Sequence, residues 1–338
     1  MTLLRLRFVL LCALACFALP ASAAPPRNLL ANPGFEDGVV GHPWMPASWD
    51  TSVSGLPSVF FGRDTLLAHG GRYSADVANV STLLYMAHNW SQRLLVTREM
   101  WGKDLVFSVW TRSNGLTGRA YLLAQAYRDT ISKMAGTWNV PRDSAANLLR
   151  LPGRADPAML LGWERRTFDE QETDWVRREV RIFIPPTTNV VFVRVGLFGT
   201  GQVLLDDASV TLEPARPAKA PRAGENLLAN GGFESGTQGW EISMAPYPGM
   251  RIESDSTAAH DGRKSVRMES GAGDYVTSRT GICQGIANRA LAGKRVRLTA
   301  WVRTDSLRSS TYTKIYCHTP RGVAQVPQGE PFGATPGW

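Results

Sequence analysis

The sequence contains few of the residues on which enzyme chemistry most often depends. It has four cysteines and five histidines among 338 residues, and the histidines show no spacing typical of metal ligands. It contains no Gly-x-Ser-x-Gly nucleophile elbow, no His-Glu-x-x-His motif and no phosphate-binding loop. Glycoside hydrolysis needs two carboxylates across a cleft. Here the acidic residues of the 169–174 segment are so dense that we expect a solvated loop, so we predict no enzyme activity within this chain.

Long apolar runs are equally scarce, and one stands at the N-terminus. Arg5 and Arg7 precede an apolar run over residues 8–19, and small residues follow at 21–23. This pattern is typical of a secretory signal peptide, residues 1–23, and the run is too short for a good membrane span. A lipid anchor at Cys16 is the alternative, which the preceding Ala-Leu-Ala fits less well. We therefore predict a secreted, periplasmic or cell-surface protein with no membrane span.

The net charge of +8 is scattered along the chain. One basic patch occurs in residues 214–224, PARPAKAPRAG, whose Pro/Ala composition is that of a semi-rigid linker. Nucleic-acid binding would require a basic stripe on one face of a recognised module. We therefore expect no nucleic-acid partner.

A long phrase occurs twice. Residues 28–36 read NLLANPGFE and residues 226–234 read NLLANGGFE. Further motifs recur in the same order: residues 69–74 match 260–265, and residues 102–112 match 293–303. A period of this length is too long for a solenoid, so the sequence predicts two tandem copies of one domain, residues 24–213 and 225–338.

The second copy ends early relative to the first. Its final residue, Trp338, corresponds to Trp175, and nothing corresponds to residues 176–212 of the first copy. A sheet without its last strands exposes unpaired edges. We expect the second copy to lack its last strands, the chain to be a fragment of a larger product, and a further covalent domain to lie downstream. Cys283 and Cys317 fall on opposite strand faces in the alignment of the copies, so a disulfide between them stays open.

Strand patterns dominate both copies. Apolar runs rich in Val, Ile and Phe, separated by Gly, Pro, Asn and Asp, predict strands at 105–112, 120–127, 175–184, 190–197 and 203–212. This content favours an all-β fold in which each copy is a two-sheet β-sandwich.

The motifs together resemble a known family. The opening NLLxNxGFE phrase, His-x-Gly-x-x-Ser, a Gln before a turn, a Ser/Thr-x-Trp-x-Arg strand and a closing Leu-Asp-Asp-Ala-Ser are similar to carbohydrate-binding modules of the galactose-binding-like jelly-roll group. Such modules are appended to xylanases, glucanases and related enzymes. The resemblance implies tandem jelly rolls and polysaccharide as the partner. It is more specific for the fold than for sugar binding, because many members of the group are spacers.

The strand around Trp110 indicates a candidate sugar platform. Residues 105, 107, 109 and 111 form the core face, so Trp110 and Arg112 lie on the opposite face. Indole rings pack against the C–H patches of pyranoses, and Arg or Gln binds their hydroxyls. If the next strand is a neighbour, Gln125 and Tyr127 join the same surface. The alternative is that a loop covers Trp110 and its role is structural.

Other aromatic residues extend the prediction. The first copy contains an insertion with Trp138 and Trp163, which either close over a ligand or pack over a sheet face. In the second copy the corresponding carbohydrate-binding candidates are Trp301, Arg303 and Tyr316. Gln92 shares its strand face with Leu94, so we expect a buried, hydrogen-bonded side chain there.

The resemblance also implies a structural calcium ion in the first copy. Calcium prefers hard oxygen ligands, and the matching positions are Glu36, Asp207 and the carbonyls around Gly71 and Arg72. In the second copy only Glu234 and its turn remain. The alternative is that Glu36 and Asp207 merely accept hydrogen bonds from backbone N–H groups.

The sequence therefore predicts non-catalytic polysaccharide binding by exported β-sandwich modules. The alternative function is a structural or interaction spacer that positions a downstream domain without binding sugar.

Overall fold

The computed structural model describes residues 27–51, 57–81, 87–128, 159–168, 171–242, 250–270, 281–307, 311–319, 322–325, 333, 335, 337 and 338. The predicted signal peptide and Trp138 lie outside these residues. No helix among the described residues is long and apolar enough to cross a membrane.

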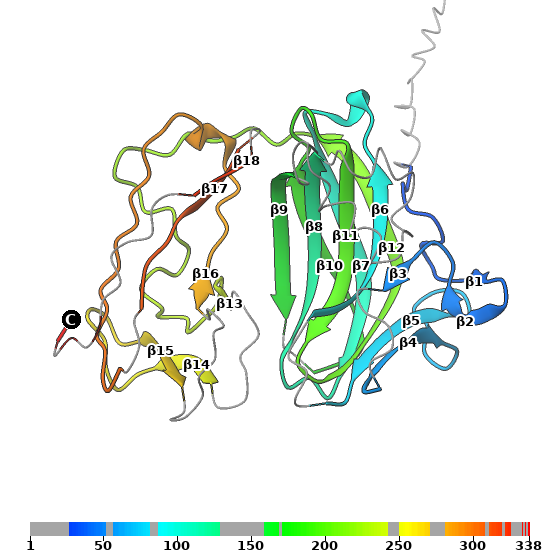
Figure 1. The fold of residues 1–338 in the computed structure, drawn as a ribbon, viewed down its shortest axis with the longest axis horizontal. Coiled ribbons are helices and arrows are strands. Elements are labelled where there is room, and N and C mark those ends of the chain that lie inside the picture. Colours follow the sequence, from blue (N-terminus) through cyan, green and yellow to red (C-terminus); the bar gives the residue numbers. More distant parts are fainter. Residues whose placement is uncertain are drawn as a thin grey trace, which may run out of the picture.

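The first copy is built from two antiparallel five-stranded sheets that face each other (Figure 1). One sheet has the strand order β10-β7-β12-β5-β4 and the other has the order β3-β6-β11-β8-β9. The strands of the first sheet are β4 (Val59–Asp64), β5 (Ser74–Asn79), β7 (Lys103–Asn114), β10 (Glu172–Phe183) and β12 (Gly201–Pro214). Those of the second are β3 (Asp50–Thr51), β6 (Ala87–Leu95), β8 (Arg119–Arg128), β9 (Met159–Phe168) and β11 (Val190–Phe198). A hairpin of β1 (Gly38–Val39) and β2 (His42–Pro46) and a 3-10 turn, η1 (Arg98–Met100), complete this copy. The predicted all-β sandwich is therefore confirmed.

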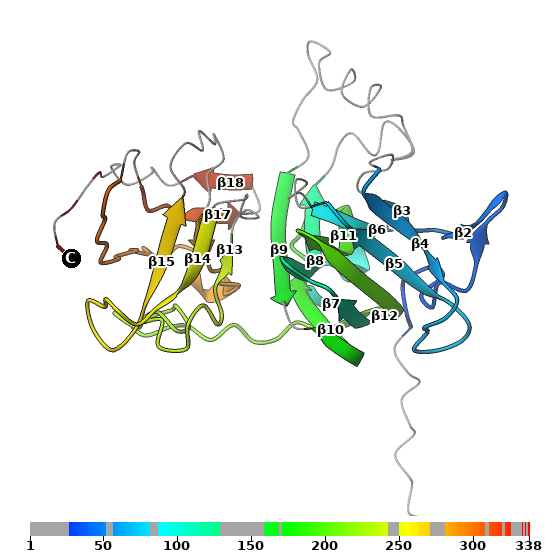
Figure 2. The same ribbon diagram turned by 90° about the horizontal axis from the view of Figure 1, so that it is seen from below.

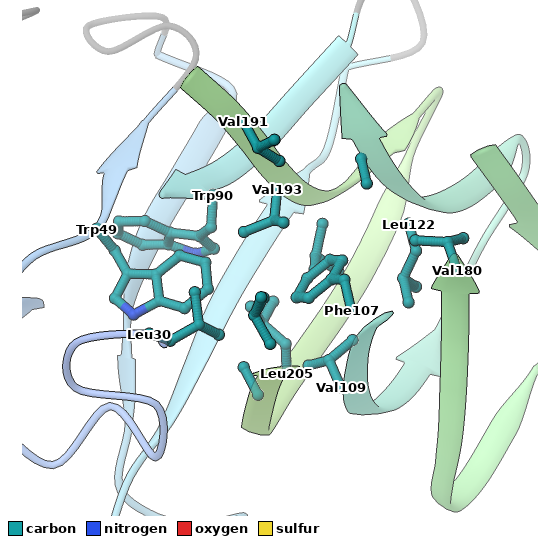
Figure 3. Packing of buried hydrophobic residues seen from close by; sticks show 14 of the residues in the cluster. Leu30, Trp49, Trp90, Phe107, Val109, Leu122, Val180, Val191, Val193 and Leu205 are labelled. Atoms are coloured by element: carbon teal, nitrogen blue, oxygen red, sulfur yellow. The ribbon is translucent and has the colours of Figure 1, made fainter. Parts of the chain in front are cut away.

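The core lies between the two sheets, because alternate residues of each strand point inward. Leu105, Phe107 and Val109 of β7 are fully buried, as the parity of that strand predicts. Val191 and Val193 of β11 face them across the interior (Figure 3). The remaining labelled core residues in Figure 3 are Leu30, Trp49, Trp90, Leu122, Val180 and Leu205.

The repeated opening phrase has a structural role. Asn32 adopts a positive φ of 46°, and its side-chain amide donates to the carbonyls of Asp37 and Ala47, both at 2.9 Å. The indole N–H of Trp49 donates to the carbonyl of Asn32 at 3.1 Å. In the second copy, Asn230 and the indole of Trp240 make the corresponding bonds.

Gln92 ties the opening phrase to the sheet. Its amide nitrogen donates to the carbonyl of Ala31 at 2.9 Å, and its oxygen accepts from the N–H of Ala31 at 2.8 Å. The side chain is buried, so the prediction of a buried, hydrogen-bonded glutamine is confirmed.

The second copy has a different architecture in its described residues. It contains three two-stranded pairs and a second 3-10 turn, η2 (Arg289–Leu291). The pairs are β13 (Glu241–Ile242) with β16 (Ile282–Cys283), β14 (Met250–Asp255) with β15 (Ser265–Ser270), and β17 (Tyr316–Thr319) with β18 (Gly322–Gln325). Every buried residue among those described lies in the first copy, between Leu30 and Val210. The second copy thus contributes no core of its own in the described residues.

The counterpart of β7 is not a strand. Residues 294–303 have no strand pairing, and Val296 and Leu298, which the repeat alignment places on a core face, are exposed. In the first copy β7 is hydrogen-bonded on both sides, to β10 and to β12. Without such neighbours, an extended segment gains neither ladder hydrogen bonds nor buried area.

The second copy lies beside β9, the edge strand of the first sandwich (Figures 1 and 2). Strands β17 and β18 are both in contact with β9. The linker is held as well, because the amide of Asn288 donates to the carbonyl of Lys219 at 2.9 Å. The guanidinium of Arg289 lies 4.0 Å from the ring centre of Phe183. The two copies therefore share a defined contact.

Candidate functional site

The predicted sugar-binding residues of the first copy divide between the two sheets. Trp110 and Arg112 lie on β7, whereas Gln125 and Tyr127 lie on β8 of the opposite sheet. All four point away from the core, as predicted from strand parity, but they point to opposite sides of the sandwich. The prediction that these four residues form a single surface is therefore wrong. The strands are consecutive in sequence, but the chain crosses from one sheet to the other between them.

Trp110 is covered on one face by a histidine. The ring of His69 stacks on it with centroids 4.0 Å apart and planes inclined by 16°. His69 also makes an edge contact with Trp175 and lies 2.6 Å, Nδ1 to Oδ2, from Asp207. A stacked ring occupies the indole surface that a sugar would need, which agrees with the structural alternative for Trp110.

The same aromatic arrangement occurs in the second copy. His260 stacks on Trp301 with centroids 4.1 Å apart, and it makes an edge contact with Trp338. Arg303 lies beside Trp338, with its guanidinium 5.7 Å from the ring centre. The repeated His-x-Gly turn thus carries its histidine to the repeated tryptophan in both copies, even though Trp301 is 67% exposed and lies on no strand.

Three carboxylates surround the turn at residues 69–73. Glu36 Oε1 accepts from the N–H groups of Arg72 and Tyr73 at 2.8 and 3.1 Å. Asp206 is fully buried and accepts from the N–H groups of His69 and Gly70 at 2.8 and 3.0 Å. Burial raises the pKa of Asp206, and these backbone N–H groups oppose the shift.

The turn needs glycine because the carboxylates are so close. A Cβ at Gly71 would collide with the Glu36 carboxylate, and one at Gly70 would collide with that of Asp207. Gly71 also has a φ of 63°, which L side chains disfavour. In the second copy Glu234 repeats the role of Glu36, because its Oε1 accepts from the N–H groups of Arg263 and Lys264 at 2.9 and 3.2 Å.

This donor set is only partly suited to calcium. Among the described residues, no group of three or more acidic, His or Cys side chains is arranged to hold a metal ion. Glu36 accepts hydrogen bonds from backbone N–H groups, which is the role that the alternative to calcium binding predicts. However, Glu36 Oε2 and Asp207 Oδ1 accept no hydrogen bond from the described residues. Two hard oxygens therefore remain near this turn.

The outer face of the second sheet carries a different set of side chains. We call it the β8–β11 face and define it by Gln125 and Tyr127 of β8, Trp163 of β9, and Phe192 and Arg194 of β11. The strand register places Trp163 opposite Gln125, and Gln125 opposite Phe192, in one row across three strands. Tyr127 lies in the next row, where its ring makes an edge contact with Phe192 at 5.9 Å. This face combines the aromatic and polar groups expected of a sugar-binding surface.

Polar groups at the centre of this face are ordered by hydrogen bonds. Arg194 Nη1 donates to Gln125 Oε1 at 2.6 Å, and the guanidinium lies 5.1 Å from the ring centre of Phe192. In the adjoining row, the amide of Asn89 donates to the hydroxyl of Tyr121 at 2.9 Å. Burial raises the pKa of Tyr121 to about 12, so its hydroxyl stays protonated near neutral pH.

Tyr316, the last candidate of the second copy, lies on β17 and is 54% exposed. The ammonium of Lys314 lies 4.6 Å from its ring centre.

No family model matches the chain, and no curated protein matches it either. Solved structures that resemble it include the enzymatically active domain of tailspike protein 4 of bacteriophage CBA120, with 10% identity and a TM-score of 0.37 over 55% of this chain and 21% of that chain. TmCBM61, solved in complex with β-1,4-galactotriose, has 17% identity and a TM-score of 0.33, covering 55% of this chain and 99% of that chain. The tandem CBM22-1–CBM22-2 domain of Paenibacillus barcinonensis Xyn10C has 16% identity and a TM-score of 0.34, covering 73% of this chain and 62% of that chain. These names include carbohydrate-binding modules, the group that the sequence motifs resemble.

Two residues of the β8–β11 face, Phe192 and Arg194, are not among the binding residues that the sequence predicts. They belong to the apolar run VVFVRVGLF, whose pattern predicts only a strand. A signal was present, because an arginine at the centre of an otherwise apolar strand must point away from the core or be paired. The sequence also does not predict that Asp206 is the buried carboxylate of the closing Asp-Asp pair. At a bulge, the sequence alone does not show which of two adjacent acidic residues points inward.

Proposed function

We propose that the first copy binds a polysaccharide, without catalysis, through the β8–β11 face. The observation that carries this proposal is the row in which the partly exposed Trp163 and Gln125 lie beside the buried ring of Phe192, with the partly exposed Tyr127 and Arg194 in the flanking rows. Aromatic rings can pack against pyranose C–H groups, while the amide and guanidinium donate hydrogen bonds to hydroxyl oxygens. Exposed platforms bury little area, so we expect modest affinity per module.

Export is part of the same proposal. A signal peptide at residues 1–23 would deliver the chain to the cell surface, the periplasm or the medium, where polysaccharides are found. There the modules would hold the protein, together with any domain attached to it, against the glycan. A second glycan-binding copy would increase retention through avidity.

Retention of the mature full chain on a panel of soluble and insoluble polysaccharides tests the proposal. Trp163→Ala should abolish retention, whereas the matched variant Trp44→Ala, an exposed tryptophan on β2 of the hairpin, should retain it. Trp110→Ala forms a third arm and should also retain binding, provided that its circular dichroism melt remains cooperative. Loss with Trp110→Ala but not with Trp163→Ala would move the site to the other sheet.

The alternative function is a spacer without sugar binding, and the contact between the copies favours it. The guanidinium of Arg165 on β9 binds the carboxylate of Glu241 in the second copy at 2.6 Å, and both side chains are largely buried. Such an ion pair would suit a protein whose role is to hold two modules at a set angle. Retention on no glycan, with an intact melt, would support this alternative.

We further propose that a calcium ion stabilises the first copy at the turn of residues 69–73. Glu36 and Asp207 would supply carboxylate oxygens, and carbonyls around Gly71 and Arg72 would complete the set. The ion would neutralise the two carboxylates and link the opening phrase to the closing strand. We expect the melting temperature to rise in calcium relative to chelator and Glu36→Gln to remove that rise; equal melting temperatures in both conditions would contradict calcium binding.

A further inference from the structure

Arg194 lies at the centre of the β8–β11 face, and no acidic side chain among the described residues pairs with it. Its row across the sheet contains Ser91 of β6, Leu123 of β8 and Arg165 of β9. Among the described residues, the contacts of its guanidinium are the hydrogen bond to Gln125 and the ring of Phe192. An arginine is always charged in proteins and carries five N–H donors. Most of these donors are therefore left without a partner on a partly buried surface.

The other charges near Arg194 do not neutralise it. Arg93 lies in the neighbouring row, opposite Phe192. Glu241 of the second copy is bound by Arg165, through Nε at 2.7 Å and Nη2 at 2.6 Å. Asp50 lies at the far edge of the sheet, on β3 opposite Ser91, where it interacts with the charge of Arg93. The centre of the face is thus electropositive.

The uncharged side chain in contact with Arg194 also presents a donor. Gln125 has its oxygen engaged by Arg194, so the amide N–H₂ is the part left for a ligand. Tyr121, whose oxygen accepts from the amide of Asn89, is only 2% exposed and so lies beneath this surface. A neutral sugar hydroxyl both donates and accepts, whereas a carboxylate or sulfate only accepts. A centre composed of donors is therefore complementary to an anion.

We propose that the polysaccharide bound by the β8–β11 face is acidic, and that Arg194 binds its anionic group. This inference rests on the proposed function and specifies the substrate class. The anionic group is a uronate carboxylate or a sulfate ester, because both offer several oxygens to the planar fork of a guanidinium. Gln125 orients that fork, and the partly exposed rings of Trp163 and Tyr127 provide apolar contact for the sugar rings.

Matched glycan pairs test the charge requirement directly. The mature full chain is titrated, by affinity electrophoresis and calorimetry, with de-esterified pectin and with fully methyl-esterified pectin, which share a backbone and differ in charge. A second pair, carrageenan and agarose, tests sulfate in place of carboxylate. We expect binding to at least one charged member to be at least tenfold tighter than to its neutral partner, and to weaken as salt rises. Polyglutamate serves as a polyanion without sugar and should not bind.

Variants assign the effect to Arg194. Arg194→Gln should weaken binding of the charged glycan at least tenfold, and Arg194→Lys, which keeps the charge but not the fork, should fall between it and the native chain. Arg112→Gln, a partly exposed arginine on the other sheet, removes the same charge and should leave binding unchanged. Circular dichroism melts show that each variant is folded.

The outcomes separate this inference from the proposed function. Equal binding of charged and neutral glycans, lost in Trp163→Ala, would keep the proposed function and overturn the acidic specificity. Binding of no glycan would overturn both. Binding of polyglutamate as tight as that of the glycan, or equal losses in Arg112→Gln and Arg194→Gln, would reduce the effect to general charge attraction and also overturn the inference.

Discussion

Arg165 of β9 and Glu241 of β13 form an ion pair that joins the two copies. Two nitrogens of the guanidinium contact the same carboxylate oxygen, and the side chains are 11% and 16% exposed. Glu164, the neighbour of Arg165, also interacts with Glu241, because burial and the charge of Glu241 raise the pKa of Glu164 to about 7. The contact between the copies therefore includes a small group of charges, Glu164 and Arg165 on β9 and Glu241 on β13.

Breaking this pair should loosen the contact between the copies. Glu241→Gln leaves Arg165 without its anion in a largely buried position, and removing one partner of such a pair costs about 1–3 kcal/mol after discounting a fully buried pair for residual solvent. We expect faster proteolysis in the linker, residues 214–224, and a larger radius of gyration by X-ray scattering. The double variant Arg165→Gln, Glu241→Gln should be less affected than the single variant, because no lone charge remains. An unchanged scattering profile in the single variant would show that other contacts hold the copies together.

The pKa of Glu164 predicts a pH dependence of stability. Its folded-state pKa, about 7, lies above the ordinary value of 4.5, so the folded state binds the proton more tightly than the unfolded state. Glu164 therefore does not oppose folding below about pH 4.5, and its destabilising effect grows as the pH rises toward 7. Glu164→Gln should raise the melting temperature at pH 8 and have no such effect at pH 4. Equal changes at both pH values would point to packing instead of ionisation.

Gln92 should contribute to stability and not to binding. Gln92→Met removes two part-buried hydrogen bonds to the backbone of Ala31, which should cost about 0.5–1.5 kcal/mol each. A matched change in the second copy, Gln284→Met, breaks the corresponding bonds to Ala229, which are solvent-exposed. We expect urea melts to show a clear loss for Gln92→Met and a smaller one for Gln284→Met, with glycan retention unchanged in both. Loss of retention without loss of stability would place Gln92 in the binding surface.

The second copy should not be stable alone. Its described residues contain no buried core, and the counterpart of β7 has no strand partners. Residues 225–338 by themselves should melt without a cooperative transition, whereas residues 24–213 should unfold in one step. A sharp calorimetric transition for residues 225–338 would contradict this expectation.

Strand content and strand parity could be predicted from the sequence because they depend on local alternation. The run around Phe107 predicts which residues face a core, and the structure confirms them, while the run around Val193 predicts a strand that the structure also contains. The repetition of the opening phrase also predicts that its two occurrences adopt the same local structure. Asn32 and Asn230 make corresponding hydrogen bonds in the two copies. These interactions involve residues close together in the chain or repeated at matching positions.

The candidate site could not be assembled in the same way. Parity places Trp110 and Gln125 on outward faces, but it does not say to which sheet each strand belongs. Pairing between β8 and β11 joins residues far apart in sequence, and it is this pairing that brings Arg194 to Gln125. Likewise, only the folded turn shows that His69 covers Trp110. The sequence by itself determined the strands, their inward faces and the duplication, because alternation and repetition are local properties. The tertiary structure decided which outward faces form one surface, because strand order depends on how the whole chain closes around its core.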